Sequence, residues 1–187
     1  MTPRRTFLKQ ASLASAPFIL PSHIWAAKGD ESPNNRVNVA IIGPGKMGRS
    51  HAHKLIRNTR VQLTGFAEIA DVRTQHTKEL IEKHYSKNTP GDKWKGLTIT
   101  KDYLELLEDK SLDAVLIATP DHWHGEATIR AARAKKHVYC EKPISLTIQE
   151  GRAMANAVKE NKIVFQTGSQ QRTEYGGKFR RTVEMVR

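Results

Sequence analysis

The sequence predicts an α/β protein built on a Rossmann-type doubly wound parallel sheet. Three motifs carry this prediction: the glycine-rich turn Gly43–Gly48, the segment Thr119–His124 and the triplet Glu141–Pro143, each directly after an apolar run typical of a strand. Parallel strands that alternate with helices end at one shared edge of the sheet, where open α/β folds bind ligands. We therefore expect the three motifs to lie side by side.

Hydrophobic periodicity predicts six strands alternating with helices, which implies right-handed crossovers. The predicted strands are Val37–Ile42, Val61–Ala67, Leu97–Thr100, Asp113–Ala118, His137–Cys140 and Ile163–Thr167. The predicted helices are Lys46–Arg57, Asp71–Tyr85, a short helix with Tyr103, Leu104, Leu106 and Leu107 inward, His122–Ala134, Thr147–Glu160, and a last one from Lys178 to Arg187.

Composition favours one domain and argues against nucleic-acid binding. The chain has 187 residues, of which 38% are hydrophobic, enough for a single core. Its formal net charge is +12, but the basic residues are scattered and form no block with interleaved aromatic residues. A solvated basic surface that attracts anionic ligands is the better interpretation.

The first residues resemble a twin-arginine export signal. Arg4 and Arg5 precede Phe7, Leu8 and Lys9, and residues 1–27 form the predicted signal peptide, followed by a polar linker at 28–36. The apolar run at 11–20 is too short and too interrupted for a membrane span. This pattern predicts export to the periplasm; the alternative is an uncleaved, disordered basic tail.

The glycine-rich turn predicts a dinucleotide site at Gly43, Gly45, Lys46, Met47 and Gly48. In such a turn the first glycine permits the tight bend, the second lets the backbone approach the pyrophosphate, and the third lets the helix pack closely on the sheet. The amino terminus of the following helix then faces the phosphates and favours an anion.

An acidic residue follows at the distance that a dinucleotide site requires. Glu68 ends the second predicted strand, 20 positions after Gly48, where its carboxylate can accept hydrogen bonds from the ribose hydroxyls and repel a 2′-phosphate. This favours NAD, although Arg73 could pair with a 2′-phosphate, so NADP stays open. Asp71 is expected to cap the following helix.

The segment after the fourth strand supplies candidate cofactor contacts at Thr119, Pro120, His122 and His124. Loop histidines at this edge are suited to hydrogen bonding or stacking with nicotinamide or substrate. No set of Cys, Asp or Glu completes a metal shell around them, so no metal is predicted. Asp121 is expected to cap the next helix, and elsewhere His51 and His53 are interpreted as ordinary surface or packing residues.

Lys142 is the candidate catalytic residue, with Glu141 beside it among the cofactor-binding residues. Pro143 restricts Lys142 to extended geometry, which would aim its side chain from the edge of the sheet. Taken alone, a Glu-Lys pair indicates a solvated surface pair; its place beside the other two motifs favours a functional role. The only cysteine, Cys140, lies in an apolar setting and is expected to be a buried structural thiol.

Together with Gln166–Arg172, these motifs resemble the Gfo/Idh/MocA family of NAD(P)-dependent oxidoreductases, named for glucose-fructose oxidoreductase and inositol dehydrogenase. The resemblance runs from about Val37 to Arg187. It implies a Rossmann domain at 37–168 and the start, at 169–187, of a connection to a second α/β domain expected to lie outside this chain. It also implies that Lys142 is the catalytic lysine, that the protein acts on a sugar or cyclitol hydroxyl, and that the missing domain forms a homo-oligomer.

Two other functions stay open at this point. Some relatives keep NAD bound and oxidise a sugar only transiently while they cleave a glycosidic bond. A non-catalytic nucleotide-binding module is the other alternative, favoured if the protein truly stops at Arg187. The final helix reaches Arg187 without a cap, however, and the chain is therefore expected to be a fragment of a longer protein.

Overall fold

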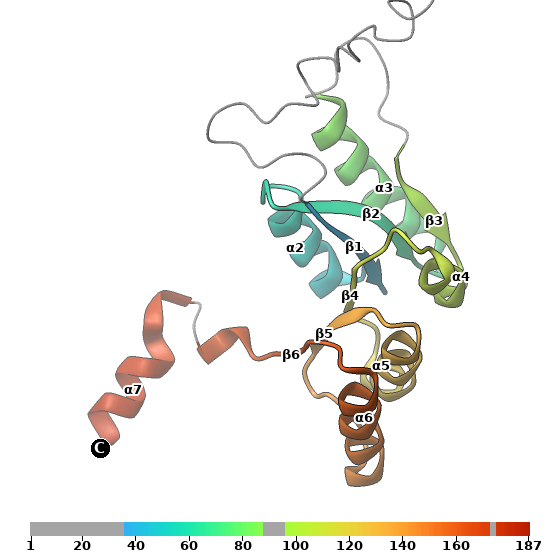
Figure 1. Cartoon of the computed structure of the whole chain (residues 1–187). Coiled ribbons are helices and arrows are strands. Elements are labelled where there is room, and N and C mark those ends of the chain that lie inside the picture. The colour runs from blue at the N-terminus through green and yellow to red at the C-terminus, as the bar shows by residue number, and fades with distance from the viewer. Residues whose placement is uncertain (1–35, 88–95, 173–174) are drawn as a thin grey trace, which may run out of the picture. The chain divides into compact units, whose positions relative to one another are not determined.

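Six apolar segments pair into one parallel sheet in the computed structural model, which describes residues 36–87, 96–172 and 175–187 (Figure 1). The strand order is β3-β2-β1-β4-β5-β6, as in a dinucleotide-binding fold. The strands are β1 (Val37–Ile42), β2 (Val61–Ala67), β3 (Thr98–Thr100), β4 (Ala114–Ile117), β5 (His137–Glu141) and β6 (Phe165–Gly168). The predicted signal peptide and all of the linker except Arg36 lie outside the described residues.

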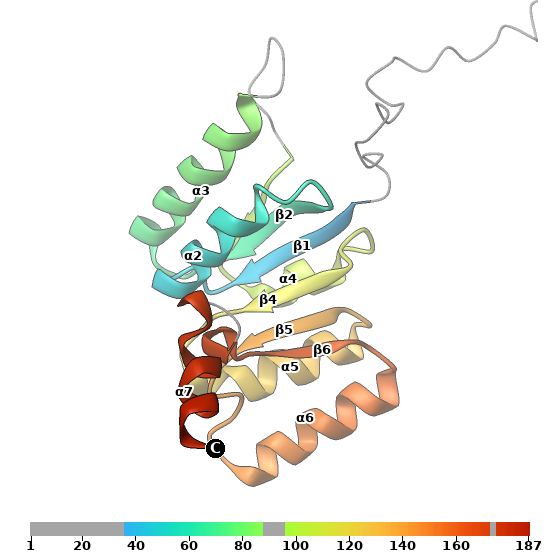
Figure 2. The ribbon, with the colours of Figure 1, turned by 90° about the vertical axis from the view of Figure 1, so that its left-hand side faces the viewer.

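Helices connect the strands and cover the sheet on both faces (Figure 2). The α-helices are α2 (Lys46–Leu55), α3 (Asp71–Ser86), α4 (Tyr103–Glu108), α5 (His124–Arg133), α6 (Ile148–Asn161) and α7 (Lys178–Val186). Three short 3₁₀ turns are η3 (Asp121–Trp123), η4 (Gln170–Arg172) and η5 (Tyr175–Gly177). The predicted fold class is therefore confirmed.

The strand register brings the ends of the central strands to one level. Ile42 at the end of β1 lies opposite Ala67 of β2 on one side and Ile117 of β4 on the other. The chain order reverses between β1 and β4, because β2 and β3 extend the sheet one way and β5 and β6 the other. This reversal opens the crevice in which doubly wound sheets bind ligands.

Two buried clusters hold the helices against the sheet. On one face Ile41, Leu63 and Phe66 pack with Ala52 of α2 and Ile81 of α3. The opposite cluster joins strand residues to α4 and α5; its members include Ile42, Val115, Ile117, Leu107 and Ala131. Alternate residues of one strand point to opposite faces, so Ile41 and Ile42 belong to different clusters.

Some local expectations differ from the structure. The predicted helix from His122 begins instead with the 3₁₀ turn η3, closed by a hydrogen bond from the Trp123 amide to the Pro120 carbonyl. Asp71 does not cap α3, because Ala70 is the N-cap and Asp71 already lies in the helix. Asp121 accepts a hydrogen bond from the adjacent His122 amide rather than capping α5. Leu104, expected inward, is 39% exposed.

Cys140 lies in the interior of the sheet, as expected for a structural thiol. Its exposed fraction is 0%, and burial raises its pKa from 9.0 to about 11. The thiolate is the reactive form of cysteine, so the native thiol is both shielded and protonated at neutral pH. Separately, no helix within the described ranges is long and apolar enough to cross a bilayer.

We expect native Cys140 to resist alkylation by iodoacetamide at pH 8, because labelling requires the sheet to open. Unfolding in guanidinium should accelerate labelling by at least about 100-fold, as measured by mass spectrometry. Ser50→Cys provides an exposed thiol on α2 as the control and should label rapidly in the native state. Equal labelling rates of Cys140 in native and unfolded protein would contradict its buried position.

Candidate nucleotide and catalytic site

The turn after β1 is held by close contacts that leave no room for a side chain at Gly43. Gly43 has a φ of +78°, which favours glycine, and its amide donates to the Ala67 carbonyl over 2.9 Å. A Cβ atom at Gly43 would come within 2.8 Å of the Thr119 side chain. The turn after β1 and the segment after β4 therefore touch at the edge of the sheet.

Gly48 is closely surrounded by other atoms, whereas Gly45 borders open space. A Cβ at Gly48 would lie 2.6 Å from the Gly43 carbonyl oxygen, so α2 approaches the turn as closely as its backbone allows. At Gly45 a Cβ would meet no atom within 4 Å among the described residues. Gly45 is the N-cap of α2 and has no capping side chain, so the first helical amides face open space. This cradle fits a phosphate.

Glu68 borders a cavity of about 450 Å³ between the ends of β1, β2 and β4. The residue is only 6% exposed, and its Oε1 accepts a hydrogen bond from the Ala70 amide over 2.9 Å. Arg73 and Lys101 line the same cavity, and Lys101 pairs with Asp71 over 2.9 Å at the surface. The cavity is thus lined both by Glu68, which is predicted to bind the ribose, and by cationic side chains that could contact a 2′-phosphate.

Aromatic side chains close the other side of this cavity. His122 and Trp123 line it from η3, and both are exposed. His122, predicted to contact nicotinamide or substrate, thus borders the same cavity as Glu68. Tyr103 at the start of α4 also lines it, and burial raises the pKa of its phenol, with a smaller contribution from the Glu126 carboxylate.

The three sequence motifs meet at a second cavity of about 270 Å³. Met47 borders it from the first motif, Thr119 from the second, and Lys142 from the third. Its full lining is Met47, Ala118, Thr119, Asp121, His124, Glu141, Lys142 and Pro143. The predicted convergence at the carboxyl edge is therefore present, with Pro120 bordering the larger cavity and Lys46 exposed at the start of α2.

His124 joins two loops through its ring. The residue is 2% exposed; Nδ1 lies 2.6 Å from the Pro143 carbonyl oxygen and Nε2 lies 2.9 Å from that of Thr119. Both ring nitrogens therefore contact the backbone, which leaves neither for the hydrogen bond to nicotinamide or substrate that the sequence suggested. The ring instead ties the segment after β4 to the segment after Lys142.

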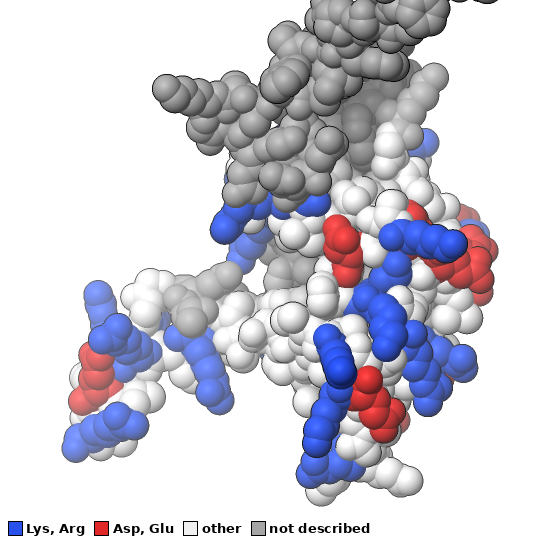
Figure 3. Space-filling model, viewed as in Figure 1, with Lys and Arg blue, Asp and Glu red and all other residues white. Residues whose placement is uncertain are grey.

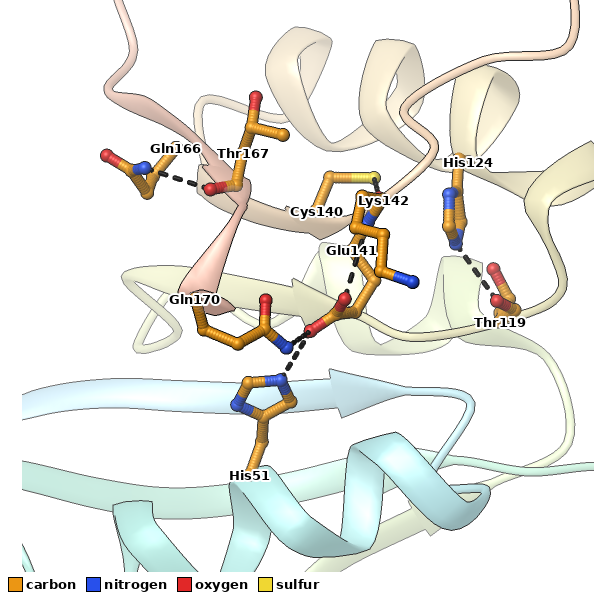
Figure 4. A network of polar contacts seen from close by, with 9 residues as sticks. All are labelled: His51, Thr119, His124, Cys140, Glu141, Lys142, Gln166, Thr167 and Gln170. Atoms are coloured by element: carbon orange, nitrogen blue, oxygen red, sulfur yellow. Dashed lines mark hydrogen bonds and ion pairs between the residues drawn. The ribbon is translucent and has the colours of Figure 1, made fainter. Parts of the chain in front are cut away.

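Glu141 and Lys142 turn to opposite sides of the strand end (Figure 4). Glu141 is buried, and its carboxylate accepts from His51 over 2.6 Å and from Gln170 over 2.9 Å. Lys142 is exposed and extends toward the Thr119 side. The two residues therefore do not form a solvated surface pair.

The sequence pattern alone predicts only a surface or packing role for His51 and gives no sign of its contact with Glu141. His51 lies four positions after Met47 on α2, and residues four apart share one face of a helix. The position of Met47 in the glycine-rich motif was the available signal that His51 faces the same edge. Gln170 was part of the motif Gln166–Arg172, but nothing in its pattern indicated a contact with Glu141.

The described part of the chain holds no group of three or more His, Cys, Asp or Glu side chains arranged to bind a metal ion. On the face in Figure 3, Lys and Arg side chains occur on several elements with acidic side chains between them.

Comparison with known proteins finds oxidoreductases with a similar sequence. A family model described as "Oxidoreductase family, NAD-binding Rossmann fold" matches residues 37–169. The sequence is 31% identical to myo-inositol 2-dehydrogenase of Thermotoga maritima, over 80% of this chain and 40% of that protein. It is 33% identical to levoglucosan dehydrogenase of Pseudarthrobacter phenanthrenivorans, over 68% of this chain and 32% of that protein.

A solved structure gives the same result for the fold. The crystal structure of myo-inositol 2-dehydrogenase from Lactobacillus plantarum superposes with a TM-score of 0.66 and 27% identity, covering 81% of this chain and 41% of that one. A glycosyl hydrolase family 109 protein of Stenotrophomonas maltophilia is 28% identical, over 79% of this chain and 31% of that protein. The chain thus spans about a third to two fifths of the length of these relatives.

Alanine at Gly45 and at Gly48 should have separable effects. Gly45→Ala should leave the melting temperature within about 2 °C of the original but weaken NAD binding at least about tenfold, because the new methyl enters only the open cradle. Gly48→Ala should also lower the free energy of unfolding by about 1–3 kcal/mol, because its methyl meets the Gly43 carbonyl. Thermal denaturation and titration calorimetry measure both; equal loss of stability in the two variants would contradict this geometry.

Proposed function

The chain belongs to the Gfo/Idh/MocA oxidoreductase family with its NAD-binding Rossmann fold, and from this premise we propose an enzyme that uses NAD to oxidise a hydroxyl group of a sugar or cyclitol. The observation that carries the proposal is Lys142 at the edge of the smaller cavity, beside the nucleotide cradle. Its similarity to a myo-inositol dehydrogenase and a levoglucosan dehydrogenase supports this substrate class.

The residues present fit the cofactor. The open space at Gly45 and the first amides of α2 would receive the pyrophosphate, and the Glu68 carboxylate would accept hydrogen bonds from the hydroxyls of the adenosine ribose. Bound NAD supplies the acceptor for the hydride that leaves the substrate carbon. The nicotinamide would lie toward the smaller cavity, where Met47 and Thr119 form the walls.

Lys142 would act on the substrate oxygen. When an alcohol carbon loses hydride, its hydroxyl proton must leave as the carbonyl forms, and negative charge develops on the oxygen. The amino group of Lys142 can hydrogen-bond that oxygen, stabilise the charge and take part in moving the proton. The protein contributes position and electrostatics, while the redox chemistry belongs to the cofactor.

A redox-neutral glycosidase is the second candidate. Similarity to the glycosyl hydrolase family 109 protein supports it, because that match covers 79% of this chain. The two functions differ in their products: a dehydrogenase accumulates NADH, whereas a glycosidase of this kind releases an aglycone with no net change in NADH.

Replacing Lys142 tests the catalytic role. We expect Lys142→Met in the intact protein to lower kcat at least about 100-fold while the Kd for NAD changes less than about twofold, because the side chain faces substrate oxygen rather than the phosphates. Lys159→Met on α6 is the control for loss of a surface lysine. Turnover is followed by NADH absorbance with inositols and anhydrosugars; undiminished turnover by Lys142→Met would rule out this role, and aglycone release without NADH would favour the glycosidase.

Glu68 should set the preference between cofactors. We expect Glu68→Gln, which can still accept from the Ala70 amide, to lower the ratio of NAD to NADP affinity at least about tenfold, because repulsion of the 2′-phosphate is lost. Arg73→Ala in the same background should reverse part of the gain in NADP affinity. Calorimetric titration with each nucleotide measures the ratio; an unchanged ratio in Glu68→Gln would show that Glu68 does not contact the ribose.

A further inference from the structure

The Glu141 carboxylate is buried beneath the candidate catalytic lysine and is held by three donors. Its Oε1 accepts from His51 Nε2 over 2.6 Å and from Gln170 Nε2 over 2.9 Å, and its Oε2 accepts from the Lys142 amide over 3.3 Å (Figure 4). The side chain is only 6% exposed. A buried carboxylate is costly unless it is hydrogen-bonded, so these donors determine where it lies.

The shortest of these contacts comes from the nucleotide helix. His51 lies on α2, its side chain is 12% exposed, and its ring packs edge-on against Tyr139 at a centroid distance of 5.3 Å. A carboxylate can only accept hydrogen bonds, so Nε2 of His51 carries the hydrogen in this contact. His51 is thus fixed both by its ring and by its donor.

Gly168 packs tightly against this carboxylate, in a position where a side chain would crowd it. A Cβ at Gly168 would lie 3.0 Å from the Glu141 carboxyl carbon and 3.0 Å from the Tyr139 hydroxyl. The end of β6 therefore closes over Glu141 with glycine backbone alone. The Glu141 carboxylate at the end of β5 is thus contacted by His51 of α2 and lies against Gly168 of β6. Its second oxygen accepts a hydrogen bond from the Lys142 amide.

We propose that His51 is a positioning residue for Lys142: by holding the Glu141 carboxylate it fixes the backbone at Lys142 and connects the nucleotide-binding helix to the catalytic group. The catalytic part of this inference rests on the function proposed for Lys142. His51 itself lies on the far side of Glu141 from the Lys142 amine and does not touch the reacting atoms (Figure 4). A displacement of the lysine by about 1 Å is enough to cost up to about 100-fold in rate.

Two substitutions separate the donor of His51 from its ring. His51→Phe keeps a ring against Tyr139 but has no donor, whereas His51→Gln places an amide donor within reach of Glu141 but has no ring. His53→Phe is the matched control, because His53 is an exposed histidine on the same helix. The readouts are kcat, the Kd for NAD, and hydrogen exchange of the Lys142 amide by NMR.

We expect His51→Phe to lower kcat about 10- to 100-fold, to change the Kd for NAD less than about twofold, and to speed exchange of the Lys142 amide. His51→Gln should recover at least about tenfold of that loss and restore slow exchange, and His53→Phe should match the unmodified protein. Unchanged kcat and exchange in His51→Phe would overturn the proposal, as would equal impairment of both His51 variants.

Two further outcomes are a His51→Phe variant that does not fold and a failure of the function proposed for Lys142. If His51→Phe fails to fold, His51→Gln decides: turnover within about tenfold of the original supports a donor role, and folded protein as slow as Lys142→Met overturns it. Failure of the proposed function is seen separately, as full turnover by Lys142→Met. The exchange rate of the Lys142 amide then still decides whether His51 positions that residue.

Discussion

The contact between the Gly48 backbone and the Gly43 carbonyl is the constraint on which the rest of the site depends. Because no side chain separates them, α2 begins directly at the edge of the sheet and presents its first amides there. The same closeness brings His51, three residues after Gly48 on α2, within 2.6 Å of Glu141 on β5. One glycine contact thus places both the candidate phosphate cradle and the donor behind Lys142.

The edge of the sheet is held together by polar side chains that join neighbouring loops. His124 contacts carbonyl oxygens in the segments after β4 and β5, and Glu141 accepts hydrogen bonds from α2 and from the segments after β5 and β6. These contacts are buried, where hydrogen bonds are strong and unpaired groups are costly. The loops that surround the smaller cavity are therefore fixed from behind, while the side facing a ligand stays open.

Much of the fold could be predicted because its signals are local. Apolar runs such as Val37–Ile42 and the glycine spacing depend on residues close in sequence, and all six strands were expected within two residues of their observed ends. The roles of His51 and His124 depend on partners 90 and 19 positions away along the chain. Spacing alone could not show that both nitrogens of His124 face backbone carbonyls, or that His51 reaches a buried carboxylate.

The two outermost strands of the sheet are short. β3 has three residues and β6 has four, whereas the inner strands β1 and β2 have six and seven. An edge strand exposes backbone donors and acceptors that can recruit a strand from another molecule, and short edges are one way in which proteins limit such aggregation. Short strands at both margins therefore offer little backbone for uncontrolled growth, while the two longest strands, β1 and β2, lie inside the sheet and β1 leads into the glycine-rich turn.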